Sequence, residues 1–188
     1  MRRILLPLLC ALLAGCPEQS GLQCPPNTSV VGEYALTFTA RHDAGECIAV
    51  PDAGTDAGPL LLALDPPFVK GVTLCVATGS DGGPELQLVS PGKGLKKSDV
   101  LADGGFHFTG DPVAQGQTAC ICDVDITETI DGFLNAGGPF ALRADGGLPP
   151  VTGISGTLVD LLTDAGSATP CRCALPCTVT YSLSGVSL

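Results

Sequence analysis

The sequence predicts an all-β domain, either an antiparallel sandwich or an up-and-down barrel, that disulfide bonds stabilise. Three observations favour this fold class. Short segments alternate apolar and polar residues, Asp-Gly and Asp-Ala-Gly units recur between them, and the 188 residues include 10 cysteines. Alternation with a period of two is typical of strands that have one buried face and one solvated face.

Charge and hydropathy exclude two classes of protein. Nineteen acidic residues against nine basic ones give a net charge of -10. A nucleic-acid-binding surface needs a basic face, which nine Lys and Arg do not supply. A hydrophobic content of 45% with a mean hydropathy of +0.37 excludes an acidic disordered tail. The length corresponds to one domain.

The N-terminus has the organisation of an export signal. Arg2 and Arg3 precede an apolar run at 4–14, which is shorter than the roughly 20 residues that span a bilayer. The run ends in Leu13-Ala14-Gly15-Cys16. This box resembles the lipobox of bacterial lipoproteins, and the resemblance covers residues 1–16 only. It implies that the signal is removed and that Cys16 carries lipid. An ordinary secretory signal, with Cys16 in a disulfide, is the alternative.

The resemblance also implies a location and a domain plan. Residues 1–15 are expected to be the signal peptide, 16–29 the lipidated cysteine and a short tether, and 30–188 one β-domain. Loss of two arginines leaves seven basic and nineteen acidic residues, so anionic headgroups would repel the chain itself. The lipid on Cys16 is therefore the expected membrane contact in the cell envelope. Pro17 follows Cys16, and the absence of Asp there favours the outer over the inner membrane.

Eight cysteines remain after Cys10 is removed and Cys16 is lipidated, and an even number in an exported chain predicts four disulfides. Cys120 and Cys122 lie two apart in a strand-like run, so we expect them to face one side and to bond elsewhere than to each other. We predict that two of the last three cysteines pair with them and that the third pairs with one of the first three. The candidates are Cys24, Cys47, Cys75, Cys120, Cys122, Cys171, Cys173 and Cys177.

A thiolate site for zinc or copper(I) is the alternative interpretation of these cysteines. An oxidising compartment favours disulfides, and no His lies near either cluster in the sequence. We therefore predict neither a metal nor any other cofactor.

Strands are predicted along the chain at 34–38, 72–76, 86–88, 106–108, 118–130 and 177–183, with a less regular candidate at 154–162. Between strands, Asp-Gly pairs tolerate the positive φ of a type I′ turn. They predict hairpins at 101–106 and 143–148, and a further turn at Asp131. The Asp-Ala-Gly repeats at 51–59 predict a low-complexity loop.

Few residues are candidates for chemistry. The chain has no Gly-x-Ser-x-Gly or His-Glu-x-x-His motif. His42 and His107 are both expected to be solvated. His107 lies between Phe106 and Phe108 in a predicted strand, so its side chain points to the face opposite that of the two phenylalanines. Three lysines, Lys93, Lys96 and Lys97, are expected in a solvated Gly-rich loop rather than an anion site.

Paired acids offer a calcium alternative. Asp123 and Asp125 share a strand face with Thr127, but hard cations need about six oxygen ligands. We therefore expect solvated acids that discourage sheet aggregation. Asp52 and Asp56 present the same alternative in their loop.

The sequence as a whole favours a lipid-anchored, non-catalytic structural or interaction module without a nucleic-acid partner. A barrel that carries a small apolar ligand is the second hypothesis, because aliphatic residues are many and charges are few. An enzyme is the third, and it would need carboxylates or His107 to converge in one cleft.

Overall fold

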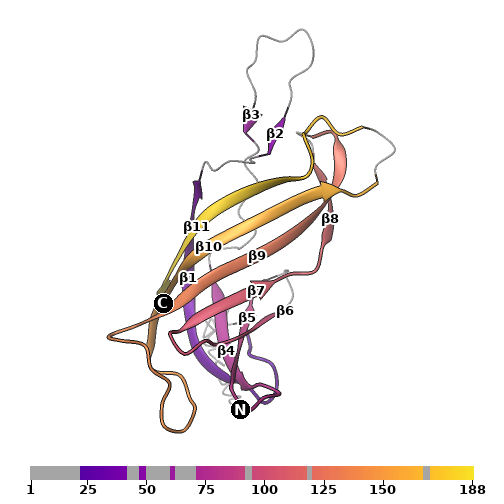
Figure 1. The fold of residues 1–188 in the computed structure, drawn as a ribbon. Coiled ribbons are helices and arrows are strands. Elements are labelled where there is room, and N and C mark those ends of the chain that lie inside the picture. The colour runs from indigo at the N-terminus through magenta and orange to yellow at the C-terminus, as the bar shows by residue number, and fades with distance from the viewer. Residues whose placement is uncertain are drawn as a thin grey trace, which may run out of the picture.

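The computed structural model describes residues 22–41, 47–49, 60–61, 71–91, 95–117, 120–166 and 170–188. These ranges contain strands and no helix, which confirms the all-β prediction. The strands are β1 (Ser29–Arg41), β2 (Ile48–Ala49), β3 (Leu60–Leu61), β4 (Val72–Thr78), β5 (Pro84–Val89), β6 (Leu95–Asp99), β7 (Gly105–Thr109), β8 (Val113–Gln117), β9 (Cys122–Ala136), β10 (Val151–Asp164) and β11 (Cys177–Ser187) (Figure 1).

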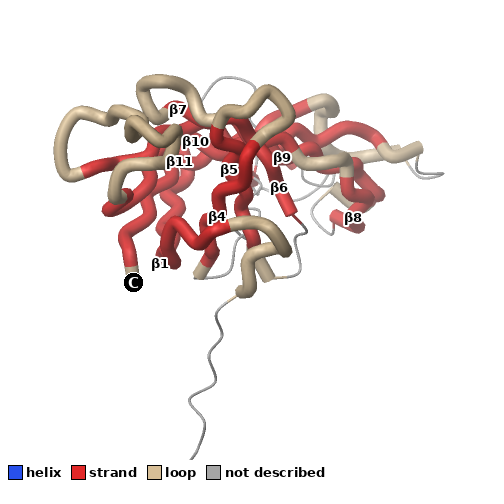
Figure 2. Tube along the Cα trace, turned by 90° about the horizontal axis from the view of Figure 1, so that it is seen from below, coloured by secondary structure: helices blue, strands red, loops and turns tan. Residues whose placement is uncertain are grey.

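One nine-stranded antiparallel sheet curves into a nearly closed up-and-down barrel (Figures 1 and 2). Its order is β6-β5-β4-β1-β11-β10-β9-β7, and β8 pairs with β9 beyond the end of β7. Strand β1 joins the two halves, because Tyr34 is opposite Val72 of β4 and Ser187 of β11. The short strands β2 and β3 pair only with each other.

Side chains bridge the seam between β6 and β7, the two end strands of the sheet order. The backbone N–H of His107 donates a hydrogen bond to Ser98 Oγ at 2.8 Å. On the inside, Lys96 Nζ lies 2.8 Å from Glu128 Oε1 of β9. The ammonium group of Lys96 also lies beside Gly110, where a Cβ atom would collide with it. Among the described residues, the Ser98 hydroxyl thus links β6 to β7, and the ion pair of Lys96 and Glu128 links β6 to β9.

The interior is built from the apolar members of the alternating segments. Because successive side chains point to opposite faces, every second residue of a strand contributes to the core. Its largest fully buried members are Tyr34, Phe108, Leu74, Leu86, Ile130, Leu158 and Leu162. A T-shaped contact between Phe38 and Tyr181 lies beside them.

The Asp-Gly-Gly turns share one geometry that differs from the predicted type I′. At Asp81, Asp103 and Asp145, Oδ1 accepts the N–H of the residue two positions later at 2.9–3.0 Å. Only the intervening glycine has a positive φ, whereas type I′ requires it at both central residues. The turn at 143–148 also lacks flanking strands, so the hairpin prediction there was wrong.

Three local predictions need correction. Strand β9 begins at Cys122, because Cys120 lies in a turn and Ile121 has a φ of 54°. Asp131, predicted in a turn, lies within β9. Lys96, predicted to be solvated, is 8% exposed in β6, because Glu128 compensates its charge on the inner face.

Candidate functional site on the outer face of the barrel

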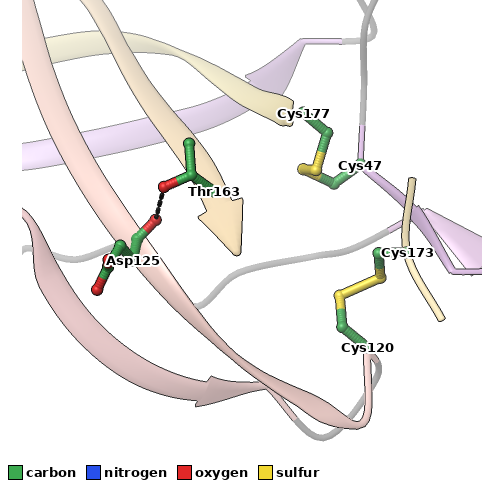
Figure 3. Close-up of a disulfide and its surroundings, with 6 residues drawn as sticks. All are labelled: Cys47, Cys120, Asp125, Thr163, Cys173 and Cys177. Carbon is green, nitrogen blue, oxygen red and sulfur yellow. Dashed lines mark hydrogen bonds between the residues drawn. A yellow bond between two sulfur atoms is a disulfide. The ribbon is translucent and has the colours of Figure 1, made fainter. Parts of the chain in front are cut away.

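The structure joins the eight candidate cysteines in four disulfides. They are Cys24–Cys75, Cys47–Cys177, Cys120–Cys173 and Cys122–Cys171 (Figure 3 shows the second and third). Two of the last three cysteines thus bond to Cys120 and Cys122, and the third bonds to Cys47. All eight sulfur atoms are in disulfides, so none of them is a thiolate ligand. Four disulfides indicate an oxidising compartment outside the cytoplasm.

The bond between Cys24 and Cys75 fixes the beginning of the described chain to β4. Cys16 lies outside the described residues. Eight positions separate it from Cys24, and a fully extended chain of that length reaches about 26–29 Å. Residues 24–28 of the predicted tether therefore lie against the barrel, where 25–28 line a hollow together with residues of β4, β5 and β6.

A groove of about 610 Å³ opens on the outer face where β6, β7, β9 and β10 contribute residues. Cross-strand register builds part of it, because His107 is opposite Asp131 and Asp131 is opposite Thr157. These three side chains stand in one row across neighbouring strands. The lining residues are Ser98, Asp99, Leu101, Asp103, Gly105, Phe106, His107, Asp131, Gly132, Phe133, Gly156 and Thr157.

His107 is held by two side chains on this face. Its Nδ1 lies 2.6 Å from Asp131 Oδ1, and its Nε2 lies 2.9 Å from Thr109 Oγ1. The side chains of His107 and Asp131 are both 62% exposed, which confirms the solvated position predicted for His107. His42 lies outside the described residues.

Hydroxyl, imidazole and carboxylate follow one another here in the order of an activated-nucleophile chain. However, Thr109 is not among the residues that line the groove. The open setting also leaves the contact between His107 and Asp131 screened by water. The contacts therefore orient the imidazole ring beside the groove, and we assign them a positioning role.

The groove wall is apolar at two exposed positions. Leu101 is 60% exposed and Phe133 is 53% exposed. Behind them, Phe106 packs against Gly132, where a Cβ atom would lie 2.6 Å from Cζ of the ring. Glycine at this position therefore permits the close approach of the aromatic ring. An exposed aromatic residue beside polar groups is typical of recognition surfaces.

The charge of the groove is acidic. Asp99, Asp103 and Asp131 line it, and no Lys or Arg is among the lining residues. Asp103 uses Oδ1 in its turn, and Asp131 uses Oδ1 on His107. No sequence signal marks this cluster, because Asp99 of β6, Asp103 of the turn before β7 and Asp131 of β9 come together only in the folded barrel.

A second, polar hollow of about 510 Å³ lies beside residues 25–28. Gln87, only 4% exposed, donates from Nε2 to Glu85 Oε1 at 2.7 Å, and Lys97 Nζ lies 3.0 Å from the same oxygen. The hydrogen bond from Gln87, followed by that from Lys97, lowers the pKa of Glu85. Lys93 lies outside the described residues. This network fastens β5 to β6 on the outside of the barrel.

The acids considered for calcium do not assemble a site in the described ranges. Asp123 is exposed, and the backbone carbonyl of Asp125 accepts a hydrogen bond from Thr163 Oγ1 at 3.5 Å (Figure 3). No group of three His, Cys, Asp or Glu side chains that could hold a metal ion occurs among the described residues. Asp52 and Asp56 lie outside them.

None of the described residues belongs to a helix long and apolar enough to cross a membrane. Comparison with protein-family models, curated proteins and solved structures gives no match to this chain.

Proposed function

We propose that this protein is a lipid-anchored interaction module of the bacterial cell envelope that binds its partner through the outer groove. The observation that carries the proposal is the groove itself, with its exposed Phe133 and its carboxylates. Its volume of about 610 Å³ lies within the roughly 300–1,000 Å³ of ligand-binding clefts.

The barrel-like, disulfide-rich fold is compatible with a non-catalytic module and with a carrier. Two features favour the first. The interior contains large buried side chains such as Tyr34 and Leu158, together with the charged pair of Lys96 and Glu128. An apolar ligand inside the barrel would have to lie beside these charges, which disfavours the carrier.

The lipid anchor of the proposal rests on Leu13-Ala14-Gly15-Cys16, and the four disulfides support export. Cells that express the full chain are labelled with radioactive palmitate, and their membranes are separated by density. We expect label in the wild type, in the outer-membrane fraction, and no label in Cys16→Ala. An unlabelled wild type would contradict the anchor.

The groove is tested with a photo-crosslinking amino acid in place of Phe133, and in place of Leu161 as a control on β10. Leu161 is also exposed and lies outside the groove lining. Adducts are expected at the first position only, and they should weaken when Asp99 is changed to Asn. Equal adducts at both positions would contradict a groove-specific contact.

A further inference from the structure

We infer that the outer groove takes an arginine side chain from an extended basic segment of a protein partner. The inference rests on the proposed function, because it names the partner chemistry of the same groove. It combines the volume of the groove, its apolar wall and its charge.

The dimensions of the groove suit one or two side chains. It is an open depression of about 610 Å³ rather than a closed cavity. Strands β7, β9 and β10 form its base, and the turn that contains Asp103 contributes to its lining. A side chain that projects from an extended segment can therefore enter it without displacing the core.

The wall supplies a surface for an aliphatic stem and a planar head group. Phe133 and Leu101 are more than half exposed beside buried Phe106. The guanidinium of arginine stacks on aromatic faces and is more weakly hydrated than the ammonium of lysine. This favours arginine over lysine in a groove with the exposed phenyl ring of Phe133.

The negative charge of the groove complements the positive charge of an arginine side chain. Three carboxylates, of Asp99, Asp103 and Asp131, line the groove without a Lys or Arg among the lining residues. Asp103 Oδ1 accepts the N–H of Gly105 at 2.9 Å, and Asp131 Oδ1 lies 2.6 Å from His107 Nδ1. Carboxylates accept the N–H groups of a guanidinium in paired, charge-assisted hydrogen bonds. The net charge of -10 for the whole chain would also steer basic partners toward it.

The test uses the oxidised full chain in non-ionic detergent and a fluorescein-labelled peptide that alternates Arg with Leu. Matched peptides carry Lys, Gln or Glu in place of Arg, and fluorescence polarisation measures the dissociation constant Kd. We expect Kd to rise severalfold with Lys and about tenfold or more with Gln, since charge-assisted hydrogen bonds are lost. The Glu peptide should not bind.

Protein variants locate the contact. Asp99→Asn and Phe133→Ala are each expected to raise Kd for the Arg peptide about fivefold or more, as at interface anchor residues. Asp145→Asn is the control, because it removes the same charge from an exposed carboxylate outside the groove lining. It should leave Kd unchanged within about twofold, because Asp145 does not line the groove and solvent and salt screen exposed charges.

Equal effects of Asp99→Asn and Asp145→Asn would overturn the inference, because the peptide would then sense only the overall charge. Equal affinity for the Arg and Gln peptides would overturn it as well, as would absence of binding. These failures are distinct from failure of the proposed function. If the wild type is palmitate-labelled and the variant with the crosslinker at position 133 gives adducts, but the wild type does not bind the Arg peptide, the proposed module stands and the arginine partner is excluded.

Discussion

Lys96 and Glu128 form an ion pair inside the barrel, where their side chains are 8% and 10% exposed. Asp160 of β10 is opposite Glu128 and is itself 2% exposed. Removing the lysine would leave buried carboxylates without this compensating cation, which typically costs about 3–5 kcal/mol. We therefore expect Lys96→Met to lower the free energy of unfolding by that amount in urea titrations. The double variant Lys96→Met/Glu128→Leu should lose less than Lys96→Met alone, and an equal or larger loss would contradict this account.

Tyr34 makes the free energy of unfolding depend on pH in the alkaline range. Its side chain is fully buried, its hydroxyl donates a hydrogen bond to the carbonyl oxygen of Val151 at 3.2 Å, and burial raises its pKa. Because the folded-state pKa lies above the unfolded value, the contribution to stability is complete below about pH 10 and is lost as pH rises through the folded pKa.

Tyr34→Phe tests this linkage. At pH 8 it should cost about 1 kcal/mol, the net value of one hydrogen bond. Above pH 10 its free energy of unfolding, measured by urea titration at each pH, should fall less steeply than that of the wild type. Parallel pH profiles for the two proteins would refute the role of Tyr34.

At the scale of elements, a comparison of two Asp-Gly-Gly turns distinguishes the cost of backbone strain from the cost of a side-chain collision. Gly82 has a φ of 85°, and a Cβ atom there would meet nothing within 4 Å. Gly104 has a φ of 86°, but a Cβ atom would lie 2.7 Å from the Phe140 ring. Gly82→Ala should therefore cost about 1–2 kcal/mol, the price of a left-handed L-residue. Gly104→Ala should cost more in the same denaturation assay, and Phe140→Ala should partly rescue it. Equal losses without rescue would argue against the collision.

Local patterns predict those strands whose inner face is apolar. The run around Phe106 and Phe108 is β7, and the alternation from Cys122 onward is β9. Strand β6 was missed because its inward positions are Lys96 and Ser98. Its partners on the inside and at the seam are Glu128 and the backbone of β7, and no local pattern encodes those contacts.

The candidate site was predictable only in part for the same reason. The solvated face of His107 follows from its two phenylalanine neighbours. The groove could not be predicted from neighbouring residues, because Asp131 and Gly132 resemble a turn when considered locally. In the structure they lie within β9, where the absence of a side chain at Gly132 admits the ring of Phe106. Register between distant strands, which the sequence pattern leaves undetermined, creates the site.

At the scale of the whole molecule, the disulfides differ in what they constrain. Cys120–Cys173 and Cys122–Cys171 are nested, with an offset of two residues on each side. Once the outer bond is present, the inner one closes only a very short additional loop. Cys47–Cys177 has a sequence separation of 130. It closes a loop of roughly 80 residues even with the other three bonds intact, so its effect on the unfolded state is larger.

We therefore expect the two pairs of Cys→Ala substitutions to differ in stability. Loss of Cys47–Cys177 should lower the free energy of unfolding by about 4 kcal/mol, and loss of Cys122–Cys171 by about 2 kcal/mol or less, if loop entropy dominates. Urea titration of the oxidised proteins measures both values, and peptide mapping without reductant verifies that the remaining three bonds are native. If removal of Cys122–Cys171 is as costly as removal of Cys47–Cys177, then Cys122–Cys171 stabilises the protein through native packing around β9 rather than through the unfolded chain.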